Sequence, residues 1–429
     1  MALKPDFSLY QARRAELIRM VKELHEEITT GAIVLCADFE GDDAFVQESS
    51  FYYFTGLQDP GLVCVLSLDG AQELYVPNCI EEREKWVKSE VSLQQENAAL
   101  LGFDTLSVLG ERCPRYKIYP FSPQAEYSEL IARLKNFMIP GSKIFTTWPE
   151  KSFGYLHQRL LISHLMQWCP ELEEYLADCA DIIAQMRRIK SKPEIECIFK
   201  AIQVTAQAQE AAAQAISDGV NEAEVQASLE FIMIANNAPV AFPSIVGSGP
   251  NSTVLHYMQN NRTMKKGDLV VVDIGASYGH YAADITRTYP VGGTFSERQK
   301  EIYSIVLEVQ EHIASIAQPG YYLRNSEHQD KSLHHLAIAF LKERGYDAYM
   351  PHGIGHYLGL DVHDVGDYST PLEPGDVFTI EPGIYLPQED LGVRIEDDYW
   401  MTEKGTICLS EDIPKSIEDI ERLVKQKFE

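Results

Sequence analysis

The stretch GDLVVVDIG at residues 267–275 recurs as GDVFTIEPG at residues 375–383. In both copies, Gly-Asp precedes a largely apolar run, and a carboxylate and a final glycine follow it. Each copy resembles a β-strand that ends at an acidic side chain, because β-branched and aromatic residues favour strands. A second acidic residue follows each copy, so the repeat predicts two related β-hairpins.

The first hairpin continues through ASYGHYAADITRTY. If Tyr278 and Gly279 form its two-residue loop, Asp273 lies directly opposite Asp284, with both side chains on one face. Carboxylates on directly opposite residues, whose Cβ atoms are about 5 Å apart, repel each other. The strand-like flanks limit solvation, so either a cation lies between the two aspartates or one of them is protonated.

The second copy repeats this arrangement. Glu381 and Glu396 fall on one face of a hairpin whose turn lies at PQED, residues 387–390, because an even loop places residues of this spacing opposite each other. Facing each other about a pseudo-two-fold axis, the two hairpins supply four negative charges, which two divalent cations would neutralise. A lone cation, or a carboxylate cluster without metal, is the alternative.

The stretch HGIGHYLGLDVHD, residues 352–364, supplies candidate nitrogen ligands, of which we choose His356. One imidazole and four carboxylates form a hard donor set that favours Mn²⁺, with Co²⁺, Fe²⁺ or Zn²⁺ as alternatives. A structural zinc site would use Cys and His instead. Calcium is a further alternative, but the sequence has no EF-hand loop.

Other polar residues fall near these motifs. His256 and His363 precede the first carboxylate of each copy by nearly equal distances, so they form a matched pair suited to stabilising an oxyanion and moving a proton. His352 is either a pocket residue or an ordinary core histidine. Arg394 shares a strand face with the last carboxylate and can hold the acidic array, although a surface ion pair is the alternative.

The composition excludes several classes of protein. The chain has 429 residues, 37 Lys and Arg, 64 Asp and Glu, and a net charge of −27. This balance argues against nucleic-acid or anionic-membrane surfaces. The N-terminus lacks the apolar region of a secretory signal, and no run approaches the length that spans a bilayer. Eight scattered cysteines without a C-x-x-C pair indicate reduced thiols in a cytoplasmic protein.

The organisation predicts two domains. Residues 1–180 alternate apolar runs (32–38 and 62–68) with amphipathic stretches (8–27 and 80–88), which favours an α/β domain. The aromatic stretch ESSFYYFTGLQDPG, residues 48–61, is interpreted as a buried strand edge.

Residues 181–429 form the second predicted domain. Pro193 and Glu194 mark the start of a helix that continues to about residue 217. Further helices are expected at 296–317, at about 328–344, and after residue 411.

The sequence resembles the Xaa-Pro aminopeptidases (aminopeptidase P) and the related prolidases, in the methionine-aminopeptidase-like metallopeptidase family. The stretches that carry the resemblance are FYYFTGLQDP, IVGSGPNSTVLHY, VVVDIGASYGHYAADITRTYPVGG, HGIGHYLGLDVHDVG, TIEPGIYLP and GVRIEDD. The resemblance implies an α/β N-terminal domain followed by an α+β catalytic domain with the "pita-bread" fold and a pseudo-two-fold repeat. It also implies a homo-oligomer, either a dimer or a tetramer.

The resemblance implies a role for each site residue. The ligands of two metal ions are Asp273, Asp284, His356, Glu381 and Glu396, with Asp284 and Glu396 bridging. Glu381 is the candidate base that takes a proton from a shared water, His256 or a metal stabilises the oxyanion, and His363 helps deliver the proton to the prolyl nitrogen. Arg394 matches a residue of the substrate and transition-state set, and His352 and Tyr385 match positions in the substrate pocket.

The expected activity is hydrolysis of the bond between an N-terminal residue and proline by a hydroxide held between two metals. The expected substrates are therefore peptides with proline at the second position. A prolidase restricted to Xaa-Pro dipeptides is the alternative; a basic residue closing the pocket would mark it, and the sequence does not reveal one. A binding protein on the same fold is a third reading, disfavoured because all five ligand positions are intact.

Overall fold

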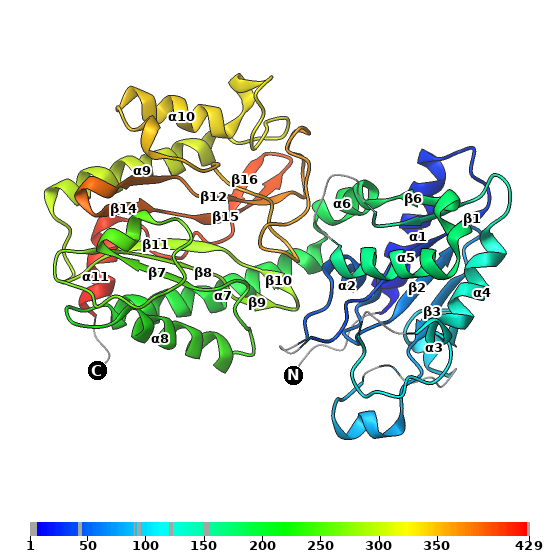
Figure 1. Ribbon diagram of the computed structural model, residues 1–429. Helices are drawn as coiled ribbons and strands as arrows, with labels where there is room; N and C mark the ends of the chain where they lie inside the picture. Colours follow the sequence, from blue (N-terminus) through cyan, green and yellow to red (C-terminus); the bar gives the residue numbers. More distant parts are fainter. Residues whose placement is uncertain are drawn as a thin grey trace. The chain divides into compact units, whose positions relative to one another are not determined.

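The computed structural model describes residues 7–41, 45–89, 91, 96–119, 123–148 and 155–426. The chain divides into two compact units, Met1–Arg187 and Arg188–Glu429, each with its own strands and helices (Figure 1). The domain limit at residue 180, where helix α6 (Ala180–Arg188) begins, stays a prediction. Within the described ranges, no helix has both the length and the apolar character needed to cross a membrane.

A six-stranded mixed sheet with the order β4-β3-β2-β1-β5-β6 organises the N-terminal unit. Its apolar strands share a buried core with helices α4 and α5, which confirms the predicted α/β class. The strands are β1 (Gly31–Cys36), β2 (Val63–Ser67), β3 (Gln72–Val76), β4 (Thr105–Val108), β5 (Lys143–Thr146) and β6 (Leu176–Asp178), and the helices are α1 (Phe7–Leu24), α2 (Ser49–Thr55), α3 (Glu96–Leu100), α4 (Ser128–Phe137) and α5 (Leu156–Trp168). The amphipathic stretch at 80–88 forms only a short 3₁₀ helix, η1 (Glu81–Lys85).

Within the aromatic stretch at 48–61, residues Ser49–Thr55 form helix α2, so the interpretation of the stretch as a strand edge is wrong. The Glu48 carboxylate accepts hydrogen bonds from the backbone N–H groups of Ser50 and Phe51, and Gly56 ends the helix with a left-handed φ of 67°. Both are ordinary helix-end signals. Phe51 and Phe54 are buried, so the aromatic residues pack from a helix although their intrinsic preference is for strands.

The predicted helices of the second unit are confirmed. A capping box of Ser191 and Glu194 begins α7 (Lys192–Ala215), with Pro193 in its first turn. The other helices are α8 (Glu222–Ala235), α9 (Glu297–Ile316), α10 (Leu333–Glu343) and α11 (Ile417–Lys425). Helices α7 and α8 lie on one side of the strands, and α9 and α10 lie on the other (Figure 1).

The sequence repeat forms two long, bent β-ribbons. The first contains β8 (Leu269–Ile274), β9 (Ser277–Tyr278), β10 (Tyr281–Ala282) and β11 (Ile285–Pro290), and the second contains β12 (Val377–Ile380), β13 (Gly383–Leu386), β14 (Leu391–Arg394) and β15 (Asp397–Thr402). β7 (Ile245–Ser248) pairs with β8, and β16 (Gly405–Cys408) pairs with β15. The pseudo-two-fold repeat predicted from the sequence is therefore present.

One buried glutamine holds each ribbon at its bend. Gln209 of α7 donates to the carbonyl oxygens of Val272 and Ile285, and Gln310 of α9 donates to those of Ile380 and Ile395. These carbonyls lie next to the acidic positions of their ribbons, so equivalent helices support equivalent sites. A buried side-chain amide satisfies backbone groups that the bend leaves without strand partners.

The register of the first ribbon differs from the prediction. Its loop is Gly279–His280, because Tyr278 pairs with Tyr281, and Asp273 pairs with Thr286. Asp284 is therefore diagonal to Asp273 rather than directly opposite it. The two-residue shift keeps both aspartates on the same face, because side chains alternate with a period of two.

The second ribbon has the predicted register. Pro387–Asp390 forms the loop, Leu386 pairs with Leu391, and Ile380 pairs with Asp397. Continuing this register places Glu381 opposite Glu396, as expected.

The two ribbons meet along a polar seam, which we define as the contacts of residues 286–288 with residues 394–397. Thr286 donates to the Glu396 carboxylate at 2.7 Å, and Thr288 donates to the backbone oxygen of Arg394 at 2.9 Å. Between them, the fully buried Arg287 pairs with Asp397 at 2.7 Å. Three successive residues of β11 thus fix one half of the repeat against the other.

Candidate metal centre

A cavity of about 360 Å³ lies in the second unit, where the two ribbons converge. It combines acidic residues from both ribbons with histidines and glycines of the 352–364 stretch. The lining residues are Leu255, His256, Asp273, Asp284, Arg324, His352, Gly353, Gly355, His356, His363, Tyr368, Glu381, Arg394 and Glu396. Four of the five predicted ligands thus come from the ribbons, and the fifth comes from the glycine-rich loop.

His356 lies at the centre of the carboxylate group. Its Nε2 atom is 3.4 Å from Asp284 Oδ2, 3.7 Å from Glu381 Oε1 and 4.0 Å from Glu396 Oε1. Its Nδ1 atom lies 3.1 Å from the backbone oxygen of Tyr357, and this contact orients the ring. The Nε2 atom therefore faces the acidic cluster, as a metal ligand would.

The carboxylates strongly perturb one another. Burial, followed by the charges of neighbouring acids, raises the pKa of Asp284 and of Glu396 well above the ordinary values. Burial also raises the pKa of Glu381, although His356 and Arg394 oppose the shift. Such pKa shifts are typical of a functional site in which several carboxylates lie close together with little access to water.

The donor set fits divalent cations. Asp284, His356 and Glu396 each offer one ligand atom, and these atoms lie within 4.8 Å of one another. Asp273 Oδ1 and Asp284 Oδ1 are buried and make no hydrogen bond in the described structure. Buried oxygens without partners are costly in a folded protein unless a cation satisfies them.

Arg394 links the acidic cluster to the pocket wall. Its guanidinium donates to Asp273 Oδ2 at 2.7 Å and to the Tyr385 hydroxyl at 2.9 Å, and the same hydroxyl lies 3.0 Å from His352 Nε2. Burial and the charge of Arg394 lower the pKa of His352 to about 4. Tyr385 is buried and is not among the residues that line the cavity, although the family resemblance places it in the substrate pocket.

The matched histidines both line the cavity. The ring of His363 lies 4.2 Å, centre to centre, from that of His356. Burial, together with the nearby imidazoles of His356 and His256, lowers the pKa of His363 to about 4. His363 is therefore a neutral ring at pH 7, able to accept or donate a hydrogen bond.

Sequence reasoning overlooked several residues of this region. Thr286 is the direct strand partner of Asp273, which the wrong register concealed. Asp398 accepts a hydrogen bond from the Asp284 backbone N–H at 3.2 Å, and its position two residues after Glu396 could have placed it on the same face. Arg324 and Tyr368 also line the cavity, but no motif surrounds either of them.

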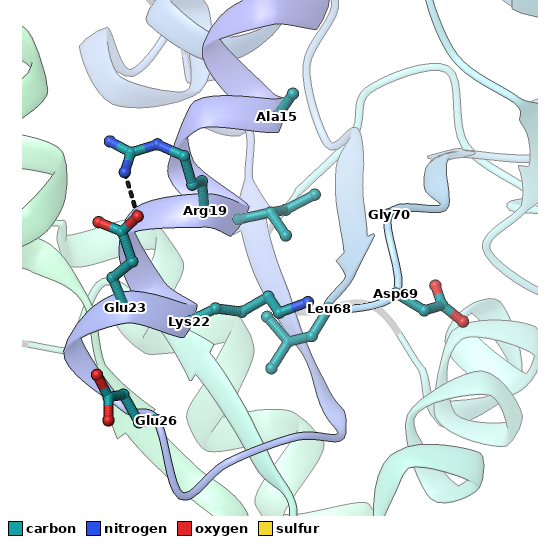
Figure 2. A pocket seen from close by; sticks show the side chains of 9 residues that line it. Ala15, Arg19, Lys22, Glu23, Glu26, Leu68, Asp69 and Gly70 are labelled. Atoms are coloured by element: carbon teal, nitrogen blue, oxygen red, sulfur yellow. Dashed lines mark hydrogen bonds and ion pairs between the residues drawn. The ribbon is translucent and has the colours of Figure 1, made fainter.

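A larger concavity, of about 480 Å³, lies on the N-terminal unit. Figure 2 shows that it runs along α1 beside the turn at Asp69 and Gly70, with Arg19 paired to Glu23. Its lining mixes charges of both signs on a helix surface. It contains none of the residues that the sequence assigns to catalysis, so the candidate site is the cavity between the ribbons.

The two bent ribbons and the acidic, histidine-containing cavity between them define a metallopeptidase of the pita-bread class. Residues 196–403 match metallopeptidase family M24, and residues 10–111 match the aminopeptidase P N-terminal domain. The chain belongs to this family, as a hydrolase of the Xaa-Pro aminopeptidase type.

Named relatives support this assignment. The human Xaa-Pro aminopeptidase 3 is 34% identical over 411 residues, which cover 89% of this chain and 77% of that protein. An Xaa-Pro dipeptidase of Pyrococcus furiosus is 43% identical over 230 residues, which cover 52% of this chain and 64% of that protein. A structure of an Escherichia coli aminopeptidase P variant with substrate has a TM-score of 0.79 at 27% identity, covering 98% of this chain and 99% of that one.

Proposed function

We propose that this hydrolase removes the first residue from peptides that carry proline at the second position. We also propose that Asp273, Asp284, His356, Glu381 and Glu396 hold two divalent cations. The observation that carries the proposal is the convergence of four carboxylates on one cavity, where two buried oxygens have no partner among the described residues. Named relatives include both an Xaa-Pro aminopeptidase and an Xaa-Pro dipeptidase.

When bound, the two cations would supply Lewis-acid polarisation of the scissile carbonyl and a lowered pKa for the attacking water. Glu381, whose carboxylate lies 3.7 Å from His356 Nε2, would take the proton of that water. His256 donates a hydrogen bond to the developing oxyanion. His363 relays the proton that Glu381 has taken to the prolyl nitrogen, which leaves as the amine when its bond to the carbonyl carbon breaks. The neutral state of His363 suits a proton relay.

Arg394 and its partners act as positioning residues in this scheme. The guanidinium fixes the orientation of Asp273, and the Tyr385 hydroxyl joins it to His352. The donors that face the cations are therefore held before substrate arrives, which reduces the reorganisation needed during the reaction.

The test compares three substrates with the purified chain and Mn²⁺: an Xaa-Pro dipeptide, an Xaa-Pro-Yaa tripeptide, and the matching Xaa-Ala-Yaa tripeptide. We expect release of the first residue from the proline tripeptide and little cleavage of the alanine control. Cleavage of the dipeptide alone would identify a strict dipeptidase. Cleavage of none of the three, with Mn²⁺ bound, would support a binding protein and overturn the proposal.

The metal and the assembly are further parts of the proposal. The oxygen-rich donor set supports Mn²⁺ over zinc, and elemental analysis of protein purified without added metal would identify the native ions. The free state of all eight cysteines is compatible with the cytoplasmic location that we propose. Light scattering would test the proposed dimer or tetramer.

A further inference from the structure

Arg324 is a second arginine that lines the catalytic cavity. It lies in the connection between α9 and α10, outside every motif of the site, and lines the cavity together with His256, His352 and Tyr368. Among the described residues, the only other arginine that lines the cavity is Arg394, and that side chain already contacts Asp273 and Tyr385.

The backbone on both sides of Arg324 is fixed. Leu323 is 1% exposed, and its carbonyl oxygen accepts a hydrogen bond from His334 N–H. Asn325 N–H donates to Ser332 Oγ at 3.0 Å. Arg324 therefore extends from a held segment, so presenting its guanidinium to the cavity requires little further ordering of the chain.

Arg324 is exposed, and its guanidinium makes no hydrogen bond or ion pair with any residue that the structure describes, although four carboxylates line the same cavity. Two divalent cations would balance those four carboxylates. A charged group that stays apart from them keeps its donors for an anion that enters from outside. Its charge adds to burial in lowering the pKa of the neighbouring His334 to about 4, so that imidazole does not compete as a cation.

We propose that Arg324 binds the C-terminal carboxylate of short substrates and so makes the chain selective for di- and tripeptides with a free carboxylate. This inference rests on the proposed function and specifies its substrate class. A peptide anion is the anionic group that this reaction brings into the cavity, and a guanidinium binds a carboxylate with two parallel hydrogen bonds. Arg324 is thus a specificity-determining residue with no part in the bond cleavage itself.

The experiment measures kcat/KM of the Mn²⁺-loaded protein for Xaa-Pro-Yaa and for the same tripeptide with a C-terminal amide. It uses the wild type, Arg324→Gln, Arg324→Lys and Arg422→Gln. Arg422 lies on α11 with its side chain 66% exposed, so its replacement removes one positive charge outside the cavity. The same kcat/KM measurement on Xaa-Pro peptides of two to six residues completes the experiment.

In the wild type, we expect amidation to lower kcat/KM by about tenfold to a hundredfold, mainly through KM, because a hydrogen bond to a charged group is lost. Arg324→Gln should lower kcat/KM for the free acid to the value for the amide and leave the amide unchanged. Arg324→Lys should keep part of the preference, and Arg422→Gln should keep all of it.

Two outcomes would overturn the inference while leaving the proposed function intact. One is equal cleavage of acid and amide by the wild type. The other is a loss in Arg324→Gln that is the same for both substrates, which would indicate a general effect on the cavity. Absence of cleavage of every peptide by the wild type would instead refute the proposed function.

Discussion

Asp284 is the residue on which the metal centre depends most directly. It approaches His356 to 3.4 Å, and one of its buried oxygens has no hydrogen-bond partner among the described residues. We expect Asp284→Asn to bind fewer metal ions per chain and to lose at least about a hundredfold in kcat/KM, because a neutral amide is a weaker ligand. Elemental analysis and tripeptide kinetics measure both. Asp412→Asn, at an exposed position, should change neither, and full metal content in Asp284→Asn would contradict the assignment.

Lys190 and Asp364 form a buried ion pair at 2.9 Å, with each side chain 1% exposed. Asp364 follows His363, so the pair also anchors the cavity loop. We expect Lys190→Met to lower the free energy of unfolding by about 3–5 kcal/mol, because the carboxylate stays buried without its partner. The double variant Lys190→Met/Asp364→Leu should regain much of this loss. Urea unfolding measures both, and a single variant as stable as wild type would be evidence against a structural role.

At the scale of elements, the Gly279–His280 turn explains why one predicted register was wrong. Two-residue hairpin loops commonly carry glycine second, which favoured Tyr278–Gly279. Here glycine comes first with φ 57°, and His280 adopts a φ of 69°. Few residues other than glycine, asparagine or aspartate occupy this region, so local sequence gave no sign of it.

This turn supports a prediction of its own. A side chain at residue 279 must adopt the same left-handed backbone, and its Cβ atom would lie 3.3 Å from Cys197 Sγ. We expect Gly279→Ala to lower the free energy of unfolding by about 1–2 kcal/mol. Ser277→Ala, in the adjoining strand, is the control and should have a smaller effect in the same denaturation assay. Equal stability of the two variants would contradict the turn assignment.

Much of the site could nevertheless be predicted from the sequence. Side chains alternate between the two faces of a strand, so a shift of the register by two residues leaves the acidic side chains on the same face. Asp273 and Asp284 share a face whether the register is direct or shifted by two residues. The helix at 49–55 was also within reach, since Glu48 and Gly56 signal its ends. Arg324 could not be predicted as a cavity residue, because it reaches the cavity only through the folded course of the connection between α9 and α10.

At the scale of the whole molecule, metal loading and pH should be linked. In protein freed of cations, the raised pKa values of Asp284 and Glu396 mean that the folded state binds protons more tightly than the unfolded state. The stability of this form therefore rises as the pH falls through the folded-state pKa values. We expect chelation to lower Tm at pH 8 and the deficit to shrink at pH 6, where protons also compete with metal.

Thermal scans of chelated and Mn²⁺-loaded samples across this pH range measure the difference directly. A deficit that stays constant or grows towards pH 6 would show that these carboxylates do not titrate as proposed. The double variant Asp284→Asn/Glu396→Gln is the control, because its chelated form should lose this dependence on pH.

The polar seam has a consequence for the order in which the enzyme matures. Two hydrogen bonds and an ion pair join β11 to the opposite ribbon without any metal ion; they come from Thr286, Thr288 and Arg287. The cavity between the ribbons is therefore formed by protein contacts, and metal ions are not needed to join the two halves of the repeat. We therefore expect a newly made chain to reach this fold before metal binds and to become active once divalent cations occupy the cavity.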